Sequence, residues 1–209
     1  MICGTVVRNV VGELGPEEIM SFTDEELQRP HAAAPENRGL YLFLVRLETG
    51  VRISVGALGE HDLPPGWYVY TGRARRNLVQ RVRSHFKPHK KVRWHIDRLI
   101  EQPAAVPLGA VLLSTREHPD LSECELNSKV GVQLGARAPV PGFGASDCSR
   151  RCPAHLWYVP HAVSLLQLAS VSPKAAMVLP RRFRSADGPS PEWPLSMPRY
   201  FQVDPPGRE

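Results

Sequence analysis

One short segment combines thiol and imidazole side chains at close spacing. Cys148, Cys152 and His155 occur within a single predicted loop. Thiolate sulfur and imidazole nitrogen are the ligands that Zn²⁺ prefers in proteins, although common zinc turns separate their cysteines by only two residues. The segment therefore indicates either a zinc site on Cys148, Cys152 and His155 or a loop whose thiols bind no ligand. Cys124, in a predicted helix between two glutamates, is expected to be a buried small apolar residue.

Cationic residues gather in the middle of the chain. Between residues 73 and 98 Asp97 is the only acid, whereas the basic residues are Arg73, Arg75, Arg76, Arg81, Arg83, Lys87, Lys90, Lys91, Arg93 and Arg98. Such a run is either a solvated helix face or a surface that binds phosphates. In the second case we expect Arg73, Arg75, Arg76, Lys90, Lys91 and Arg93 to contact nucleic acid.

Length and composition limit the classes of protein to which the chain can belong. Its 209 residues suffice for one buried core with extensions, and a second full domain would be cramped. The net charge of +5 and the pI near 9.2 are modest, so the distribution of charge matters more than its sum. The four irregularly spaced cysteines favour a reducing compartment. Because neither a signal peptide nor an apolar run of membrane-spanning length is visible, we expect a cytoplasmic protein that has no membrane partner.

The hydrophobic pattern indicates which elements position these residues. Apolar, β-prone residues predict strands at 40–45 and 51–55, joined as a hairpin, and a third strand at 67–71. The period then changes to that of a helix, with Leu78, Val82 and Phe86 on one stripe and Arg81 and His85 on an adjacent stripe. A second helical segment at 92–100, a strand at 110–114 and a helix at 121–132 follow. This order predicts an α+β fold in which helices flank a small antiparallel or mixed sheet.

Three regions are expected along the chain. Residues 1–38 form an acidic extension with one short helix signal, since Thr23 and Glu26 have the spacing of a capping box. Residues 39–160 form the domain. Residues 161–209 are rich in proline and are expected to be a largely disordered tail.

Two triplets in the domain, with two later residues, carry a resemblance to a known family. Gly39-Leu40-Tyr41 and Tyr70-Thr71-Gly72, followed by Arg81 on the next helix and Glu123 on a later one, resemble the GIY-YIG nuclease superfamily. Residues 65–72, 94–97, 123–126 and 141–148 are similar to its DUF123 branch, and the resemblance covers about residues 39–158. Leu40 and Thr71 depart from the name-giving isoleucines, and the branch brings no activity with it, so the residues can persist without turnover.

The resemblance implies roles that agree with the needs of phosphodiester hydrolysis. Tyr41 is similar to a tyrosine that takes a proton from the nucleophile, provided that the basic helix lowers its pKa, and Tyr70 would orient water or phosphate. Arg81 would clamp phosphate, and His85, one turn later, is an alternative base or phosphate contact. Glu123 would bind Mg²⁺ or Mn²⁺.

Three hypotheses follow from these observations. The leading one is a metal-dependent endonuclease that hydrolyses DNA phosphodiester bonds, with DNA repair as its implied setting. The second is a nucleic-acid-binding module on the same scaffold that no longer cleaves. The third is an interaction protein stabilised by zinc on Cys148, Cys152 and His155. The sequence does not indicate which DNA structure or which protein partner is recognised, since no base-reading element is visible.

Overall fold

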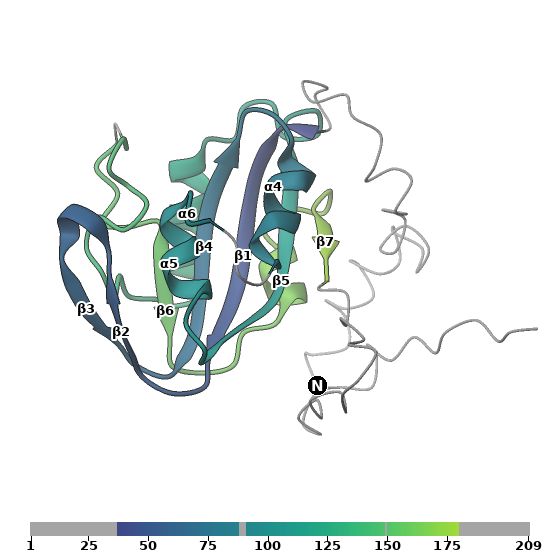
Figure 1. Ribbon diagram of the computed structural model, residues 1–209. Coiled ribbons are helices and arrows are strands. Elements are labelled where there is room, and N and C mark those ends of the chain that lie inside the picture. The colour runs from purple at the N-terminus through teal and green to yellow at the C-terminus, as the bar shows by residue number, and fades with distance from the viewer. Residues whose placement is uncertain (1–36, 88–90, 149, 180–209) are drawn as a thin grey trace, which may run out of the picture.

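The computed structural model describes residues 37–87, 91–148 and 150–179, and the structural statements below concern those residues (Figure 1). The acidic extension up to residue 36, Lys90 and the tail from residue 180 lie outside them. The elements in chain order are β1 (Gly39–Leu47), β2 (Val51–Ser54), a 3₁₀ turn η2 (Gly56–Leu58), β3 (Glu60–Leu63), β4 (Gly66–Ala74), α4 (Leu78–His85), α5 (His95–Ile100), β5 (Ala105–Ser114), α6 (Glu123–Gln133), β6 (Leu156–Val159), α7 (Leu165–Ala169) and β7 (Ala176–Val178).

A five-stranded sheet with the order β6-β4-β1-β5-β7 forms the centre of the fold, and all of its pairings are antiparallel. Its central strand, β1, is almost wholly apolar because helices cover both of its faces. Alternate residues of the strand point to opposite faces. Tyr41 and Phe43 pack in one hydrophobic cluster, whereas Leu40, Leu42 and Leu44 pack in another.

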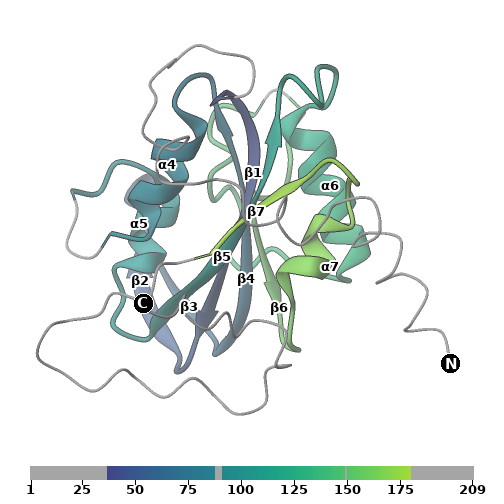
Figure 2. The ribbon, with the colours of Figure 1, turned by 90° about the vertical axis from the view of Figure 1, so that its right-hand side faces the viewer.

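Helices form a layer on each side of this sheet (Figure 2). The cluster that contains Tyr41 includes Leu78 and Val82 of α4 and Ile96 and Leu99 of α5. The cluster on the other face draws its helical members from α6 and α7, namely Leu126, Val130, Leu165, Leu168 and Ala169. The predicted α+β class is therefore confirmed, as helix–sheet–helix layers. Among the described residues no helix has the length and apolar character needed to span a membrane.

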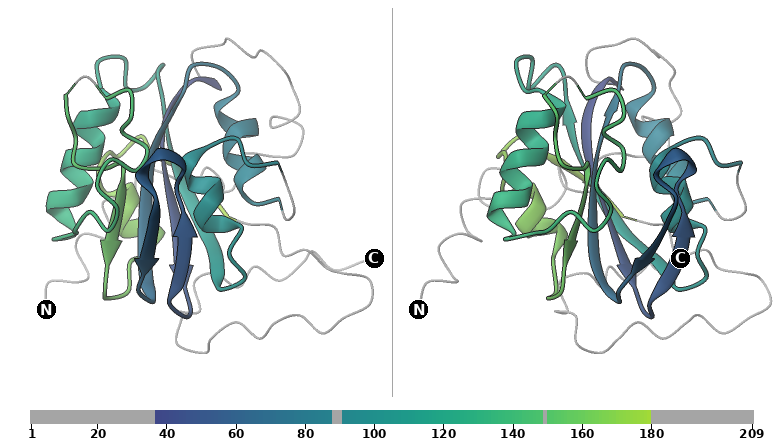
Figure 3. Two further views of the ribbon diagram at one scale, coloured as in Figure 1. Left: turned by 60° about the vertical axis from the view of Figure 1, so that its left-hand side comes forward. Right: turned by 90° about the vertical axis from the view of Figure 1, so that its left-hand side faces the viewer.

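The hairpin predicted between residues 40–45 and 51–55 does not form. Strand β2 pairs with β3 in a separate two-stranded sheet, and β1 pairs with β4 and β5 instead (Figure 3). The reason lies in the burial of the two strands. Both neighbours of β1 are long apolar strands, whereas Arg52 and Ser54 expose alternate positions of β2, which suits a strand pair at the side of the domain.

The folded region continues past residue 160, where the domain was expected to end. Helix α7 begins after Ser164, whose Oγ accepts a hydrogen bond from the backbone N–H of Gln167 at 3.1 Å. Ala176–Val178 forms β7, which pairs with β5. The expected boundary is therefore too early, because a few apolar residues between prolines add one helix to the layer and one strand to the sheet.

Candidate functional site

Tyr41 lies flat against the neighbouring strand because its cross-strand partner is a glycine. In the β1–β4 register Tyr41 stands opposite Gly72. A Cβ atom at Gly72 would lie 2.3 Å from Cζ of Tyr41 and 2.5 Å from its hydroxyl oxygen, closer than any real contact. Packing thus explains why the second triplet ends in glycine, since only glycine leaves room for the tyrosine of the first triplet.

The phenol of Tyr41 begins a buried chain of hydrogen bonds. Its hydroxyl group lies 3.1 Å from Nε2 of His85, and Nδ1 of His85 lies 3.0 Å from Oδ1 of Asp97. The side chains of His85 and Asp97 are essentially inaccessible to solvent. In the tautomer that carries its proton on Nδ1, the imidazole donates to the Asp97 carboxylate and its Nε2 accepts from the Tyr41 hydroxyl.

Asp97 is held in this position by the start of α5. Its second oxygen, Oδ2, accepts hydrogen bonds from the backbone N–H groups of Arg93 at 2.9 Å and Trp94 at 3.0 Å. A carboxylate at the beginning of a helix satisfies N–H groups that have no intrahelical partner. Asp97 therefore links the geometry of the α5 start to the orientation of the His85 ring.

Both tyrosines are harder to ionise than a free phenol. Burial, followed by the neighbouring phenol of Tyr70, raises the pKa of Tyr41 well above 10, although the positive charge of Arg81 acts in the opposite direction. Burial and the negative charge of Glu123 likewise raise the pKa of Tyr70. The charge of Arg81 thus acts in the direction expected of the basic helix, but desolvation outweighs it, so the expected net lowering of the Tyr41 pKa does not occur.

Arg81 connects two exposed basic segments of the surface, residues 73–76 and residues 91–93. Its guanidinium Cζ lies 4.0 Å from the ring centroid of Trp94, and Nη1 donates to the backbone carbonyl of Arg73. This stacking joins the middle of α4 to the start of α5. The expected nucleic-acid contacts among the described residues are all exposed on these segments, namely Arg73, Arg75, Arg76, Lys91 and Arg93.

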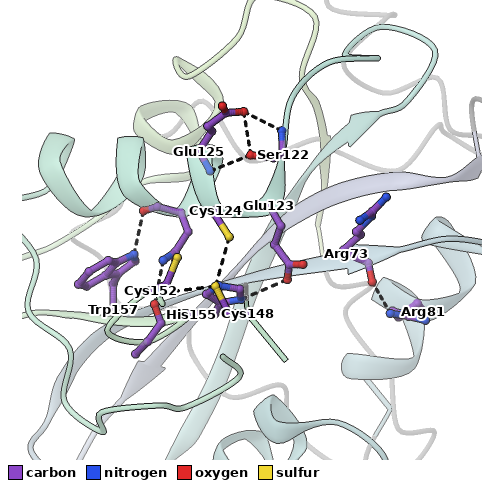
Figure 4. Close-up of polar contacts among 12 residues, drawn as sticks. Arg73, Arg81, Ser122, Glu123, Cys124, Glu125, Cys148, Cys152, His155 and Trp157 are labelled. Atoms are coloured by element: carbon purple, nitrogen blue, oxygen red, sulfur yellow. Dashed lines mark hydrogen bonds and ion pairs between the residues drawn. The ribbon is translucent and has the colours of Figure 1, made fainter. Parts of the chain in front are cut away.

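Glu123 projects from the first turn of α6 towards the same region. A reciprocal cap fixes that turn, since Ser122 Oγ accepts from the N–H of Glu125 and the Glu125 carboxylate accepts from the N–H of Ser122. The carboxylate of Glu123 lies between His155 and the paired Arg73 and Arg81 in the close-up view (Figure 4). Its charge acts on both tyrosines, as does that of Arg81, so the four expected groups lie within electrostatic range of one another.

A group of sulfur and nitrogen ligands adjoins Glu123. The ligand atoms of Cys124, Cys148, Cys152 and His155 all lie within 4.8 Å of one another, and this thiol–imidazole cluster could hold a metal ion. The predicted set of Cys148, Cys152 and His155 is thus brought together. Cys124 joins it because residue 124 is adjacent to Glu123 on α6 and its Sγ lies 3.3 Å from Sγ of Cys148.

His155 has the features of a metal ligand. The residue is 3% exposed, and neither ring nitrogen makes a hydrogen bond with the described residues, although Nδ1 lies 3.2 Å from Oε1 of Glu123. A buried polar atom without a partner costs free energy, which a bound ion would offset. Asn127 keeps this segment against α6, since its side-chain amide donates to the carbonyl of Ala154 at 2.8 Å.

The thiols of the cluster differ in how readily they ionise. Burial opposes ionisation of Cys148, but the backbone N–H of Cys152 and the neighbouring thiols and imidazole outweigh it and lower the pKa of Cys148 to about 6. Burial and the contact with Cys148 raise the pKa of Cys124 to about 12. Burial lowers the pKa of His155, but the contacts with Glu123 and Cys148 together outweigh it, so the pKa of that imidazole is raised.

Comparison with known proteins identifies the family. The sequence pattern described as "Domain of unknown function DUF123" matches residues 40–176. This span covers most of the chain and includes both helical layers, the site, and the sheet except for Gly39 and the last two residues of β7. The chain belongs to the DUF123 family. No curated protein and no solved structure matches it.

Two residues of the site were not predicted from the sequence. Asp97 was noted as the single acid in the basic run and as the end of the 94–97 stretch, without a role, yet an isolated acid among ten bases signals a specific charge partner. Cys124 was expected to be a buried apolar residue. A cysteine that directly follows the expected metal ligand Glu123, in a chain with a second group of cysteines, is the signal that could have identified it.

Proposed function

We propose that this protein is a metal-dependent phosphodiesterase of the GIY-YIG type that hydrolyses DNA. The observation that supports the proposal is the convergence of two phenols, a guanidinium group and a carboxylate on one end of the sheet, beside exposed basic segments. Phosphodiester hydrolysis needs a proton acceptor, positive charge at the phosphate and a metal, and these groups supply candidates for each need.

The buried hydrogen-bond chain supplies the proton acceptor in this proposal. Because the pKa of Tyr41 is raised, a stable phenolate is not available at neutral pH. A relay avoids this difficulty: as the attacking water gives its proton to the Tyr41 oxygen, the Tyr41 proton passes to Nε2 of His85. The proton then rests on an imidazolium beside the Asp97 carboxylate. The relay requires that substrate binding exposes the Tyr41 hydroxyl to one water molecule.

The other groups act on the phosphate. Arg81 keeps guanidinium N–H groups beyond the one that it donates to Arg73, and its planar fork matches two phosphate oxygens. The carboxylate of Glu123 is a hard oxygen ligand of the kind that Mg²⁺ and Mn²⁺ prefer. When bound, that ion would supply Lewis-acid stabilisation of the phosphate charge. The thiol–imidazole cluster suits a softer ion, Zn²⁺, which has no step in this reaction.

Incubation of the purified chain with branched, nicked and single-stranded DNA and Mg²⁺ or Mn²⁺ tests the proposal. We expect cleavage of at least one substrate, and a loss of rate of at least about 100-fold in Glu123→Gln, Arg81→Ala and His85→Ala. Glu60→Gln, which changes an exposed carboxylate on β3, is the matched control and should cleave like the parent chain. Absence of cleavage on every substrate, or equal rates in the Glu123→Gln and parent chains, contradicts the proposal.

The burial of Tyr41 favours a second candidate, a nucleic-acid-binding module that does not cleave, since the residue is 1% exposed. Binding by phosphate contacts alone weakens steeply with salt, because condensed counterions are released. Replacement of Arg75 and Arg76 by glutamate should then reduce both the affinity for DNA and its salt dependence, as measured by fluorescence anisotropy. Unchanged binding in that variant argues against both candidates, whereas binding without cleavage favours the second.

A further inference from the structure

We infer that Cys124, Cys148, Cys152 and His155 form a complete four-ligand zinc centre, and that this centre orients the carboxylate of Glu123. The zinc centre is independent of the proposed hydrolysis. Only the consequence for catalysis rests on the proposed function.

The dimensions of the cluster match tetrahedral zinc coordination. With Zn–S bonds of about 2.3 Å, two sulfur ligands of a tetrahedral ion lie about 3.8 Å apart. Sγ of Cys124 and Sγ of Cys148 are 3.3 Å apart, and no pair of ligand atoms exceeds 4.8 Å. The sulfur–sulfur separation of about 3.8 Å that zinc requires lies between the observed 3.3 Å and 4.8 Å, so small movements of the side chains would let an ion fit. The cysteines are free thiols, and 3.3 Å is well beyond a disulfide bond of about 2.05 Å.

The chemistry of the ligands selects zinc rather than magnesium. Three sulfurs and one imidazole are soft or borderline ligands, whereas Mg²⁺ and Ca²⁺ take oxygen. Four protein ligands fill a tetrahedral site and leave no position for water or substrate. The centre is therefore structural, and the reaction of the proposed nuclease would use a different ion on Glu123.

The backbone around Cys148 is already arranged to hold a thiolate. The N–H of Cys152 donates to Sγ of Cys148 at 3.4 Å, and the N–H of Arg151 donates to the carbonyl of Cys148 at 3.2 Å. Hydrogen bonds of this kind form one tight turn that brings Cys148 and Cys152 to the same side. Cys124 approaches from α6, so the ion would join the helix to the loop.

His155 connects the cluster to Glu123. With Nδ1 next to Oε1 of Glu123, the nitrogen that remains for the metal is Nε2, which is buried and makes no hydrogen bond with the described residues. Coordination at Nε2 keeps the proton on Nδ1, and a histidine bound to a metal usually donates that proton to a carboxylate. A small rotation of the ring turns the 3.2 Å contact into a hydrogen bond that fixes one oxygen of Glu123 and leaves the other for Mg²⁺ or Mn²⁺.

Metal analysis of the full chain tests the zinc centre. The chain is purified under reducing conditions, dialysed, and analysed by inductively coupled plasma mass spectrometry. We expect one zinc ion per chain in the parent protein and in Cys3→Ser, which changes a cysteine outside the cluster, and loss of zinc in Cys124→Ser and Cys148→Ser. Far-ultraviolet circular dichroism reports whether each variant is folded.

Cobalt substitution provides a second measurement that needs no variant. Co²⁺ added to the metal-free parent chain should give the intense visible bands of tetrahedral cobalt with thiolate ligands, and Zn²⁺ should abolish them. A parent chain that takes up neither ion, a Cys124→Ser chain with stoichiometric zinc, or a Cys124–Cys148 disulfide that persists after purification under reducing conditions overturns the assignment.

The Glu123→Gln and Cys148→Ser variants also test the orientation of Glu123. Glu123→Gln should keep one zinc ion and the same cobalt spectrum, because Glu123 is not itself a ligand of the centre. Cys148→Ser should bind Mn²⁺ at least about 10-fold more weakly than the parent chain in an electron paramagnetic resonance titration. Equal Mn²⁺ affinity in the two chains overturns the coupling. DNA cleavage is not needed for either readout, so failure of the nuclease proposal remains distinguishable.

Discussion

Two polar clusters adjoin the same end of the sheet, and they differ in completeness. In the Tyr41–His85–Asp97 chain, each polar side chain has a partner within hydrogen-bond distance, and the carboxylate also accepts from two backbone N–H groups. In the thiol–imidazole cluster, Nε2 of the buried imidazole makes no hydrogen bond with the described residues, Nδ1 has only the 3.2 Å contact with Glu123, and the sulfurs face one another. Protein atoms satisfy the polar groups of the first cluster, whereas the second leaves a buried nitrogen that a bound ion could satisfy. The first site is therefore complete with protein atoms alone, whereas in the second site we expect a bound ion to complete it.

The largest effect is expected from removal of the carboxylate that completes the first cluster. Asp97→Ala deprives His85 of its buried partner and leaves the N–H groups of Arg93 and Trp94 without an acceptor. We expect a loss of about 3–5 kcal/mol in the free energy of unfolding, measured by urea denaturation. Asp62→Ala removes an exposed partner of Arg52 and serves as the control, with a much smaller expected change. Equal changes in the two variants would mean that Asp97 does not complete a buried network.

Addition of zinc should stabilise the chain through the second cluster alone. At a free zinc concentration 100 times the dissociation constant, a ligand that binds only the folded state adds about 2.7 kcal/mol to the free energy of unfolding. The midpoint of thermal unfolding should rise in the parent chain and in Asp97→Asn, but not in Cys148→Ser. A rise of the same size in Cys148→Ser would place the zinc elsewhere in the chain.

A smaller loss is expected where the first cluster depends on close packing. Gly72→Ala places a methyl group against the ring of Tyr41 and should cost about 1–3 kcal/mol of stability, as overpacked cores do. Gly50→Ala, where the nearest atom to the added Cβ lies at 3.4 Å, is the matched control. If Gly72→Ala unfolds at the same urea concentration as Gly50→Ala, then Tyr41 can move without cost.

The smallest difference should appear in the pH dependence of stability. A phenol whose pKa is raised in the folded state binds its proton more tightly there than in the unfolded chain, so stability is retained below pH 10 and falls as the pH rises above that value. Each such phenol contributes a slope of up to about 1.4 kcal/mol per pH unit. Tyr41→Phe should therefore show a shallower decline above pH 10 than the parent chain. Identical slopes would mean that Tyr41 titrates normally.

The sequence was sufficient for features that depend on local pattern. The spacing of Leu78 and Val82 predicted α4, and continuous apolar, β-prone residues predicted the three central strands β4, β1 and β5, but neither edge strand, β6 or β7. The resemblance carried by the order of Tyr41, Tyr70, Arg81 and Glu123 singled out four residues that lie within electrostatic range of one another. The elements were inferred from residues close together in the chain, whereas the four site residues came from the family resemblance.

The features that could not be predicted depend on contacts distant in sequence. Glu48, Thr49 and Gly50 form a plausible hairpin turn, but the partners of β1 are decided by strands that begin much later in the chain. The pKa of Tyr41 depends on how completely α4 and α5 cover it, because burial and the charge of Arg81 act in opposite directions. A local sequence pattern cannot show which of these two opposing effects on the pKa is larger.

Strand β7 has a consequence for the edge of the sheet. It covers only Ala110, Val111 and Leu112 of β5, yet those residues are apolar and lie where that strand would otherwise present free N–H and C=O groups. Unpaired edges of this kind recruit strands from other molecules and lead to aggregation. A chain cut at residue 160 would thus keep every side chain of both polar clusters and still be prone to self-association. By pairing with β5, residues 176–178 protect the chain against that association.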